Sequence, residues 1–103
     1  MMYFIYILQS ESSDRYYIGY SSDPFRRLIE HNNSSLLTYT SKHRPWKLKA
    51  IYSCGDNKTI AIMVERFIKK QKNRKLIQSL VDGRVLTGIL AQLVKVPHVR
   101  NVE

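Results

Sequence analysis

The sequence predicts a single α/β (α+β) domain with a small three-stranded antiparallel sheet flanked by helices. Residues 2–9 and 46–53 carry apolar and alternating patterns typical of strands, and the aromatic and β-branched residues of 16–21 favour a third strand. Apolar residues recur with the helical period over 24–32 and again over 60–81. A chain of 103 residues holds one modest core, so one domain is expected.

The first strand is a near-continuous apolar run over residues 2–9, which favours a central strand that is covered on both faces. The polar segment 9–15, with three serines and an aspartate, predicts a hairpin loop. If the hairpin closes around this loop, Tyr6 and Tyr17 lie about opposite each other and point to the same face. A register slip of one residue would separate the two phenols, so the pattern alone leaves this pairing open.

The first helix is expected to begin after Asp23, whose side chain can accept a hydrogen bond from an unpaired backbone N–H group. Pro24 suits the first helical position because it has no N–H group to lose. Polar residues at 32–35 predict the end of the helix. Three residues form its expected apolar face: Phe25, Leu28 and Ile29.

Two polar side chains of this helix, Arg27 and His31, are four residues apart and therefore lie on one face. Gly19 stands in the preceding strand, at a point where a side chain would block a close approach. With Tyr17, these residues bring a phenol, a guanidinium and an imidazole onto neighbouring elements. Such a set suits the binding of a phosphodiester.

The segment 36–45 has no clean period, and we expect either a short helix or an ordered loop with a basic tip. Alternating apolar residues then mark the third strand: Trp46, Leu48, Ala50 and Tyr52. Because Trp46 opens this alternating strand, we expect it to anchor the core rather than to stack on a base.

The later helical pattern follows a turn at 55–57, with Asn57 or Thr59 as its cap, and Gly83 can end it after one polar break. The main domain is therefore predicted to span residues 1–83. The tail, residues 84–103, keeps some helical spacing, and three alternatives stay open for it: an extra helix, a contact for self-association or a poorly ordered end. The oligomeric state is expected to be a monomer or a weak homodimer.

Composition restricts the partners and the compartment. Lys and Arg number 17 against 8 Asp and Glu, and this net charge of +9 favours a polyanion, with nucleic acid as the leading candidate. No apolar run is long enough to span a membrane and no secretory leader is recognisable, so no membrane partner is expected. A single cysteine, Cys54, cannot form an internal disulfide, which suits a cytoplasmic location.

Several of these residues occur in an ordered set that resembles a known family. Tyr6, the triplet Tyr17-Ile18-Gly19, Arg27, His31 and Glu65 are similar to the signature of the GIY-YIG nucleases, especially the small stand-alone bacterial members. The resemblance covers roughly residues 2–80. The first triplet departs from the pattern, because Phe4-Ile5-Tyr6 lacks the glycine.

The resemblance implies a metal-dependent endonuclease that hydrolyses DNA phosphodiester bonds. Glu65 would be the ligand of a Mg²⁺ (or Mn²⁺) ion, and Arg27 would hold the scissile phosphate. Tyr6, Tyr17 and His31 would position or deprotonate the attacking water, and the sequence does not distinguish which of them is the base. Many members of the family also have a late asparagine, for which Asn73 is the nearest candidate.

Further basic side chains are predicted to contact the nucleic acid: Arg26, Lys42, Arg44, Lys69 and Lys72. Two alternatives to the enzyme stay open. One is a non-catalytic or weakly active nucleic-acid-binding module with the same fold. The other is an adaptor that binds a protein through the tail.

Overall fold

The fold is built on an antiparallel sheet with the strand order β2-β1-β3-β4, in which β1 (Phe4–Ser10) and β3 (Trp46–Ser53) are central. The computed structural model describes residues 1–35, 38–84 and 86–97. β2 (Tyr16–Ser21) forms one edge, and the two-residue β4 (Val94–Lys95) pairs with the end of β3 at the other. The predicted fold class is confirmed. The predicted strand number was one too low, because β4 is too short to leave a pattern in the sequence.

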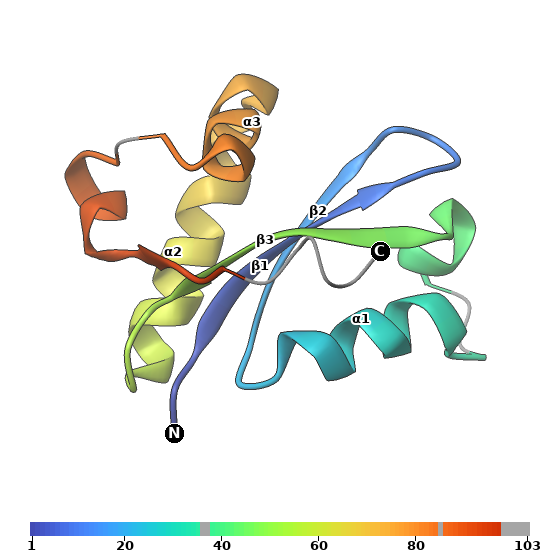
Figure 1. The fold of residues 1–103 in the computed structure, drawn as a ribbon, viewed down its shortest axis with the longest axis horizontal. Coiled ribbons are helices and arrows are strands. Elements are labelled where there is room, and N and C mark those ends of the chain that lie inside the picture. The colour runs from blue at the N-terminus through green and yellow to red at the C-terminus, as the bar shows by residue number, and fades with distance from the viewer. Residues whose placement is uncertain (36–37, 85, 98–103) are drawn as a thin grey trace.

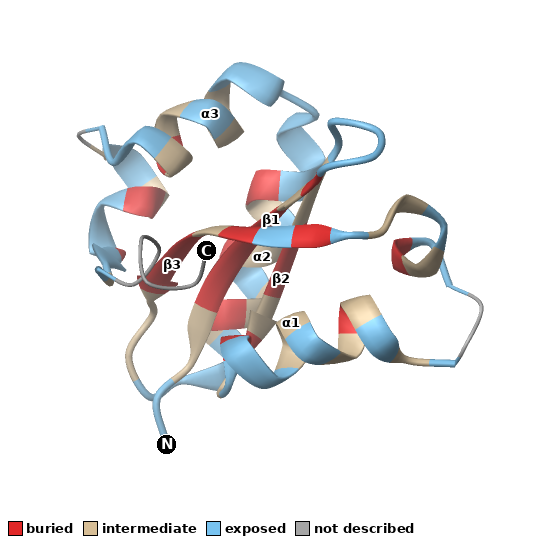
Figure 2. Cartoon of the chain, turned by 45° about the vertical axis from the view of Figure 1, so that its right-hand side comes forward, coloured by how far each residue is buried: buried red, intermediate tan, exposed pale blue. Residues whose placement is uncertain are grey.

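Helices cover both faces of this sheet (Figure 1). One face carries α1 (Pro24–Asn33) and the 3-10 helix η1 (Thr40–His43), and its buried cluster is formed by Tyr6, Leu8, Trp46, Leu48 and Ile51. The other face carries α2 (Lys58–Gln71) and α3 (Arg74–Asp82). Figure 2 shows that buried positions concentrate along β1 and β3, between these two layers.

The hairpin register differs from the predicted one. Tyr6 pairs with Gly19, and Tyr17 pairs with Leu8, so the two tyrosines are diagonal neighbours rather than direct partners. The difference is two residues, which preserves the face, and both phenols point to the α1 side of the sheet. The hairpin loop lies further along the chain than expected. Asp14 adopts a left-handed conformation with φ 55°, and the Ser10 amide donates a hydrogen bond to the Arg15 carbonyl.

An irregularity in β3 divides its alternating residues between the two faces. The register with β1 shifts between Ile7 and Leu8, opposite Lys49. Trp46 and Leu48 therefore pack on the α1 side, whereas Ala50 and Tyr52 pack on the α2 side. Trp46 is 3% exposed, which confirms its role as a core anchor.

Most helix ends are as expected. Asp23 accepts a hydrogen bond from the Arg26 amide, Asn57 accepts from two amides at the start of α2, and Gly83 ends α3 with φ 73°. The polar break between α2 and α3 is a left-handed Lys72 followed by the α3 cap, Asn73.

The apolar face predicted for α1 was wrong in part. Phe25 and Ile29 are 45% and 62% exposed, and α1 instead turns Pro24, Leu28 and His31 toward the sheet. A polar residue, His31, thus occupies the position nearest the sheet at the end of the helix.

Most of the described part of the tail packs on the α2 and α3 side, whereas Val96 packs against the cluster on the α1 side. The tail forms a short 3-10 helix, η2 (Gly88–Gln92), and β4, and its Leu90 and Leu93 join the buried cluster on the α2 and α3 side. The rest of the tail, residues 98–103, lies outside the described residues, and the division at residue 83 stays a prediction. In the described ranges, no helix combines the length and apolar character that crossing a membrane requires.

Candidate active site

The site begins with the close approach of Tyr6 and Gly19 across the hairpin. Tyr6 stands on the central strand and is 1% exposed. A Cβ atom built on Gly19 would lie 2.4 Å from both Cζ and the phenolic oxygen of Tyr6. Only glycine at this position lets the Tyr6 ring lie flat against β2, as the sequence pattern indicated for a close approach at Gly19.

A chain of buried hydrogen bonds then runs from Tyr6 into η1. The Tyr6 hydroxyl lies 3.0 Å from Nε2 of His31, and Nδ1 of His31 lies 3.1 Å from the Thr40 hydroxyl. His31 is 6% exposed, and burial, with help from the nearby Arg27 charge, lowers its pKa to about 4. The imidazole is therefore neutral at pH 7, with one nitrogen as donor and the other as acceptor.

Thr40 is a member of the site that the sequence did not reveal. It is buried, and its carbonyl also accepts a hydrogen bond from the Trp46 indole at 2.8 Å. A threonine nine positions after His31, in a segment with no clean period, carries no signal that could have identified it.

Tyr17 fills the space between the hydrogen-bonded chain and solvent. Its ring centroid lies 4.8 Å from that of His31 and 6.4 Å from that of Tyr6, and the Lys69 ammonium lies 5.2 Å from the Tyr17 ring centre. Burial raises the pKa of Tyr17, and burial together with the neighbouring phenol raises that of Tyr6 to about 12. Arg27 opposes both shifts, so it is the charge that favours phenolate here.

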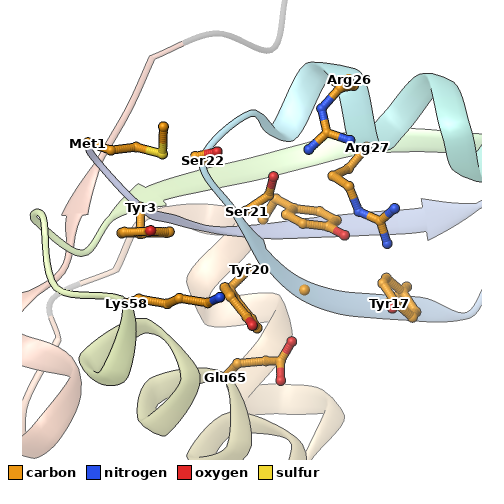
Figure 3. Close-up of a pocket in the computed structure, with 12 residues that line it drawn as sticks. Met1, Tyr3, Tyr17, Tyr20, Ser21, Ser22, Arg26, Arg27, Lys58 and Glu65 are labelled. Atoms are coloured by element: carbon orange, nitrogen blue, oxygen red, sulfur yellow. The ribbon is translucent and has the colours of Figure 1, made fainter.

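Arg27 and Glu65 approach the phenols from different elements. Arg27 comes from α1, and Glu65 reaches in from α2, so that the two side chains flank the space above β2 (Figure 3). Their side chains are 34% and 17% exposed. Both line one cavity of about 560 Å³, together with Tyr6, Tyr17 and Gly19. We call this space the site cavity.

Local ion pairs hold these charges in place. Glu30 accepts from Arg27 and, at 2.6 Å, from Arg26, and these two arginines lower its pKa. Lys69 lies 3.8 Å from the Glu65 carboxylate. The site cavity thus holds the Glu65 carboxylate, which is paired with Lys69, and the Arg27 guanidinium, which is paired with Glu30.

The carboxylate and its surroundings decide which metal ion the site cavity could hold. Among the described residues, no group of three or more His, Cys, Asp and Glu side chains converges as a metal cage. A single partly buried carboxylate, open to a cavity beside an arginine, instead fits Mg²⁺, which keeps several waters and binds through one or two carboxylates plus substrate phosphate. The residues present fit such an ion, and Glu65 would be its protein ligand.

The structure brings the five predicted site residues together, but it distributes the predicted phosphate contacts more widely. Arg26 lines the site cavity and Lys69 lies beside Glu65, whereas Lys42 and Lys72 are exposed on η1 and at the end of α2. Arg44 donates to the carbonyls of His31 and Ser34 at 2.6 and 2.7 Å, which secures the end of α1.

Asn73 does not belong to the site cavity, and two residues that were not predicted do. The Asn73 side chain caps α3 by accepting from the Lys75 and Leu76 amides, and it does not line the site cavity. Conversely, Tyr20 and Lys58 line the site cavity and were not predicted. Lys58 is the first residue of α2, so only the fold reveals its proximity to β2.

Several known proteins are similar in sequence to this chain. The GIY-YIG catalytic domain matches residues 2–78. The chain is 32% identical over 100 residues to the UPF0213 protein YsiG of Lactococcus lactis, covering 97% of this chain and 94% of that protein. It is 37% identical over 82 residues to a UPF0213 protein of Streptococcus pneumoniae, covering 79% and 80%.

A larger protein matches as well. The structure-specific endonuclease subunit SLX1 of Meyerozyma guilliermondii is 37% identical over 78 residues, which covers 71% of this chain. The chain spans only about a quarter, 26%, of the length of that protein. The relatives therefore include proteins of matching size and a longer one, of which only a segment corresponds to this chain.

Proposed function

Since the chain belongs to the GIY-YIG family of catalytic domains, we propose that it is a metal-dependent endonuclease that hydrolyses DNA phosphodiester bonds. The observation that carries this proposal is the convergence of Arg27 from α1, Tyr6 and Tyr17 from the hairpin, and Glu65 from α2 on one cavity. These elements are far apart in the sequence. Packing of the core does not require a cation, two phenols and a carboxylate at one place, so we infer a functional reason for their convergence.

Each chain residue has a defined task in this proposal. Arg27 binds the scissile phosphate, because its planar guanidinium matches phosphate oxygens and neutralises charge that develops on them. Glu65 holds the Mg²⁺ or Mn²⁺ ion, which, when bound, supplies Lewis-acid stabilisation and orients the phosphate. Tyr6 and Tyr17 surround the place of the attacking water and orient it.

The hydrogen-bonded chain behind Tyr6 fixes that phenol. Because His31 is neutral, its Nε2 can accept the Tyr6 proton while its Nδ1–H donates to Thr40. The arrangement keeps the phenolic oxygen in one orientation at the wall of the site cavity.

The nature of the substrate is supported by charge. A net charge of +9 and the basic residues around the site cavity suit the phosphate backbone of a nucleic acid. The Meyerozyma relative is named a structure-specific endonuclease subunit, and we extend this to propose that branched or partly single-stranded DNA is a better substrate than plain duplex.

The test compares Glu65→Gln with a matched control, Glu11→Gln. Glu11 pairs with Lys47 at 3.1 Å in the hairpin loop and does not line the site cavity, so the control makes the same charge change elsewhere. A labelled panel of duplex, single-stranded, flap and four-way-junction DNA is incubated with Mg²⁺ or Mn²⁺ and with EDTA. We expect metal-dependent cutting by the wild type and the control, and none by Glu65→Gln.

Two outcomes would count against the proposal. Cutting by Glu65→Gln at the wild-type rate would remove the assigned metal ligand. Salt-sensitive DNA binding by a folded wild-type protein, with no cutting of any substrate in the panel, would favour the non-catalytic binding module instead.

A further inference from the structure

A second cavity of about 460 Å³ adjoins the site cavity. The two cavities share Tyr17 and Arg27, so whatever occupies the second one continues directly from the first. We call it the Tyr39 cavity, after the aromatic residue at its outer wall. Its lining includes His31, Thr38, Tyr39 and Thr40.

Tyr39 has the properties of a stacking platform. It is 47% exposed although it is an aromatic residue, and its ring lies 4.7 Å from the His43 ring and 6.5 Å from that of the buried Trp46. The ring is therefore supported by other rings while much of its surface stays open. Aromatic side chains of this kind bind single-stranded nucleic acids by stacking on the bases.

The charges around the Tyr39 cavity favour a neutral occupant over a second phosphate. Glu30 lines this cavity and not the site cavity, and its pKa is lowered by the two arginines, so it is ionised at neutral pH. Arg27, which also lines this cavity, is paired with Glu30, so the pair presents little net charge to a phosphate, while the carboxylate can still accept hydrogen bonds from the amino groups of bases. The Thr38 hydroxyl adds a group that can act as donor or acceptor.

From the shared residues, the Tyr39 platform and the Glu30 carboxylate, we propose that the Tyr39 cavity receives the nucleobase adjacent to the scissile phosphate. This rests on the proposed function, because the phosphate held by Arg27 fixes which nucleotide lies there. A base in this cavity cannot remain stacked in a duplex. The substrate class is therefore DNA with an unpaired nucleotide beside the cut, such as a flap or the end of a junction arm.

The test removes either the platform or the base. Tyr39→Ala, Tyr39→Trp and wild-type proteins are compared on a flap whose cut position has been mapped, with a normal base or an abasic site at the nucleotides that flank the cut. Phe25→Ala is the control, because Phe25 is a 45% exposed aromatic residue that lines neither cavity.

We expect Tyr39→Ala to raise KM about tenfold on the normal flap, since loss of one stacked base weakens binding by roughly that factor or more. On the abasic flap, wild type and Tyr39→Ala should be equal, and Tyr39→Trp should resemble wild type on both. An equal loss on normal and abasic flaps, or no loss on either, would overturn the proposal.

A binding measurement separates this proposal from the proposed function. A single-stranded oligonucleotide with 2-aminopurine is titrated with Glu65→Gln and with the Glu65→Gln/Tyr39→Ala double variant. Quenching that depends on Tyr39 supports the base site even if the wild-type protein cuts nothing. Equal quenching by both proteins removes the base site even if cutting is observed.

Discussion

Replacing Gly19 by alanine tests the geometry of the site most directly. The new methyl group would lie 2.4 Å from two atoms of the Tyr6 side chain and 2.8 Å from a third. Gly19 and Tyr6 are paired in the β1–β2 ladder, so neither backbone can move away without breaking it. Gly19 does not adopt a left-handed conformation, so alanine costs nothing in backbone strain. The Tyr6 phenol must therefore leave its position.

The expected cost follows from three terms. Overpacking in a core typically costs about 1–3 kcal/mol. Displacing the Tyr6 hydroxyl leaves the buried Nε2 of His31 without its partner, which costs about 1–3 kcal/mol more. The lower entropy of the unfolded alanine chain returns about 0.4–1 kcal/mol. We expect Gly19→Ala to lower the free energy of unfolding by about 1–6 kcal/mol and to reduce turnover on the order of a hundredfold.

Urea unfolding and flap cleavage measure these two effects in the same preparations. A double variant, Gly19→Ala/Tyr6→Leu, removes the clashing atoms and should regain part of the lost stability but none of the activity. The control is Gly55→Ala, which has open space around its Cβ but φ +80°, so it should cost stability without affecting cleavage. A Gly19→Ala protein with wild-type stability and turnover would refute the reasoning.

Two further predictions concern the charges. The pKa of His31 is about 4 in the folded protein, against 6.5 for a free side chain. Between pH 4 and 6.5 the unfolded chain therefore binds more protons than the folded protein. The free energy of unfolding should fall as the pH drops from 6.5 to 4, by at most about 3 kcal/mol. Urea unfolding at pH 7 and pH 4.5 checks this, and His31→Gln should lose less stability over the interval; an identical loss in both proteins would show that His31 titrates normally. Arg27→Ala should lower turnover far more than Arg26→Ala, although both arginines pair with Glu30, and equal losses in a flap assay would deny Arg27 a special role.

Short-range patterns in the sequence predict most of the fold, whereas the membership of the site rests on the resemblance to the GIY-YIG nucleases, because its five residues are spread over residues 6–65. Strand and helix periods place β1, β3 and α1, and the ordered tyrosine, arginine, histidine and glutamate residues name the five side chains that meet. What the sequence misses depends on contacts between distant segments. The hairpin register depends on the left-handed conformation of Asp14. The division of the β3 side chains between the two faces depends on the register shift at Lys49.

Thr40 and Tyr39 illustrate the same limit within the site. Both belong to a segment that has no regular hydrophobic period. They reach the Tyr39 cavity only because η1 packs beside the end of α1. Arg44, by contrast, seemed a phosphate contact because it is basic and lies in a loop. Its guanidinium instead donates to two carbonyls at the end of α1, a use of arginine that charge alone cannot reveal.

The hydrogen-bonded chain also narrows the choice of general base under the proposed function. Both ring nitrogens of His31 lie within hydrogen-bond distance of protein hydroxyls, those of Tyr6 and Thr40, so neither is available to water. The first acceptor of the water proton is then a phenolic oxygen, and burial has raised the pKa of both phenols above the ordinary value.

Such an acceptor works only when positive charge lowers its pKa again, and within the described structure Arg27 acts on both phenols in that direction. Under the proposed function, Arg27 would therefore have two tasks, to hold the phosphate and to favour the phenolate. Its loss should shift the pH profile of cleavage to higher pH as well as lower the turnover. Arg26→Ala should leave the profile in place, and a profile that does not move in Arg27→Ala would assign the proton transfer to another group.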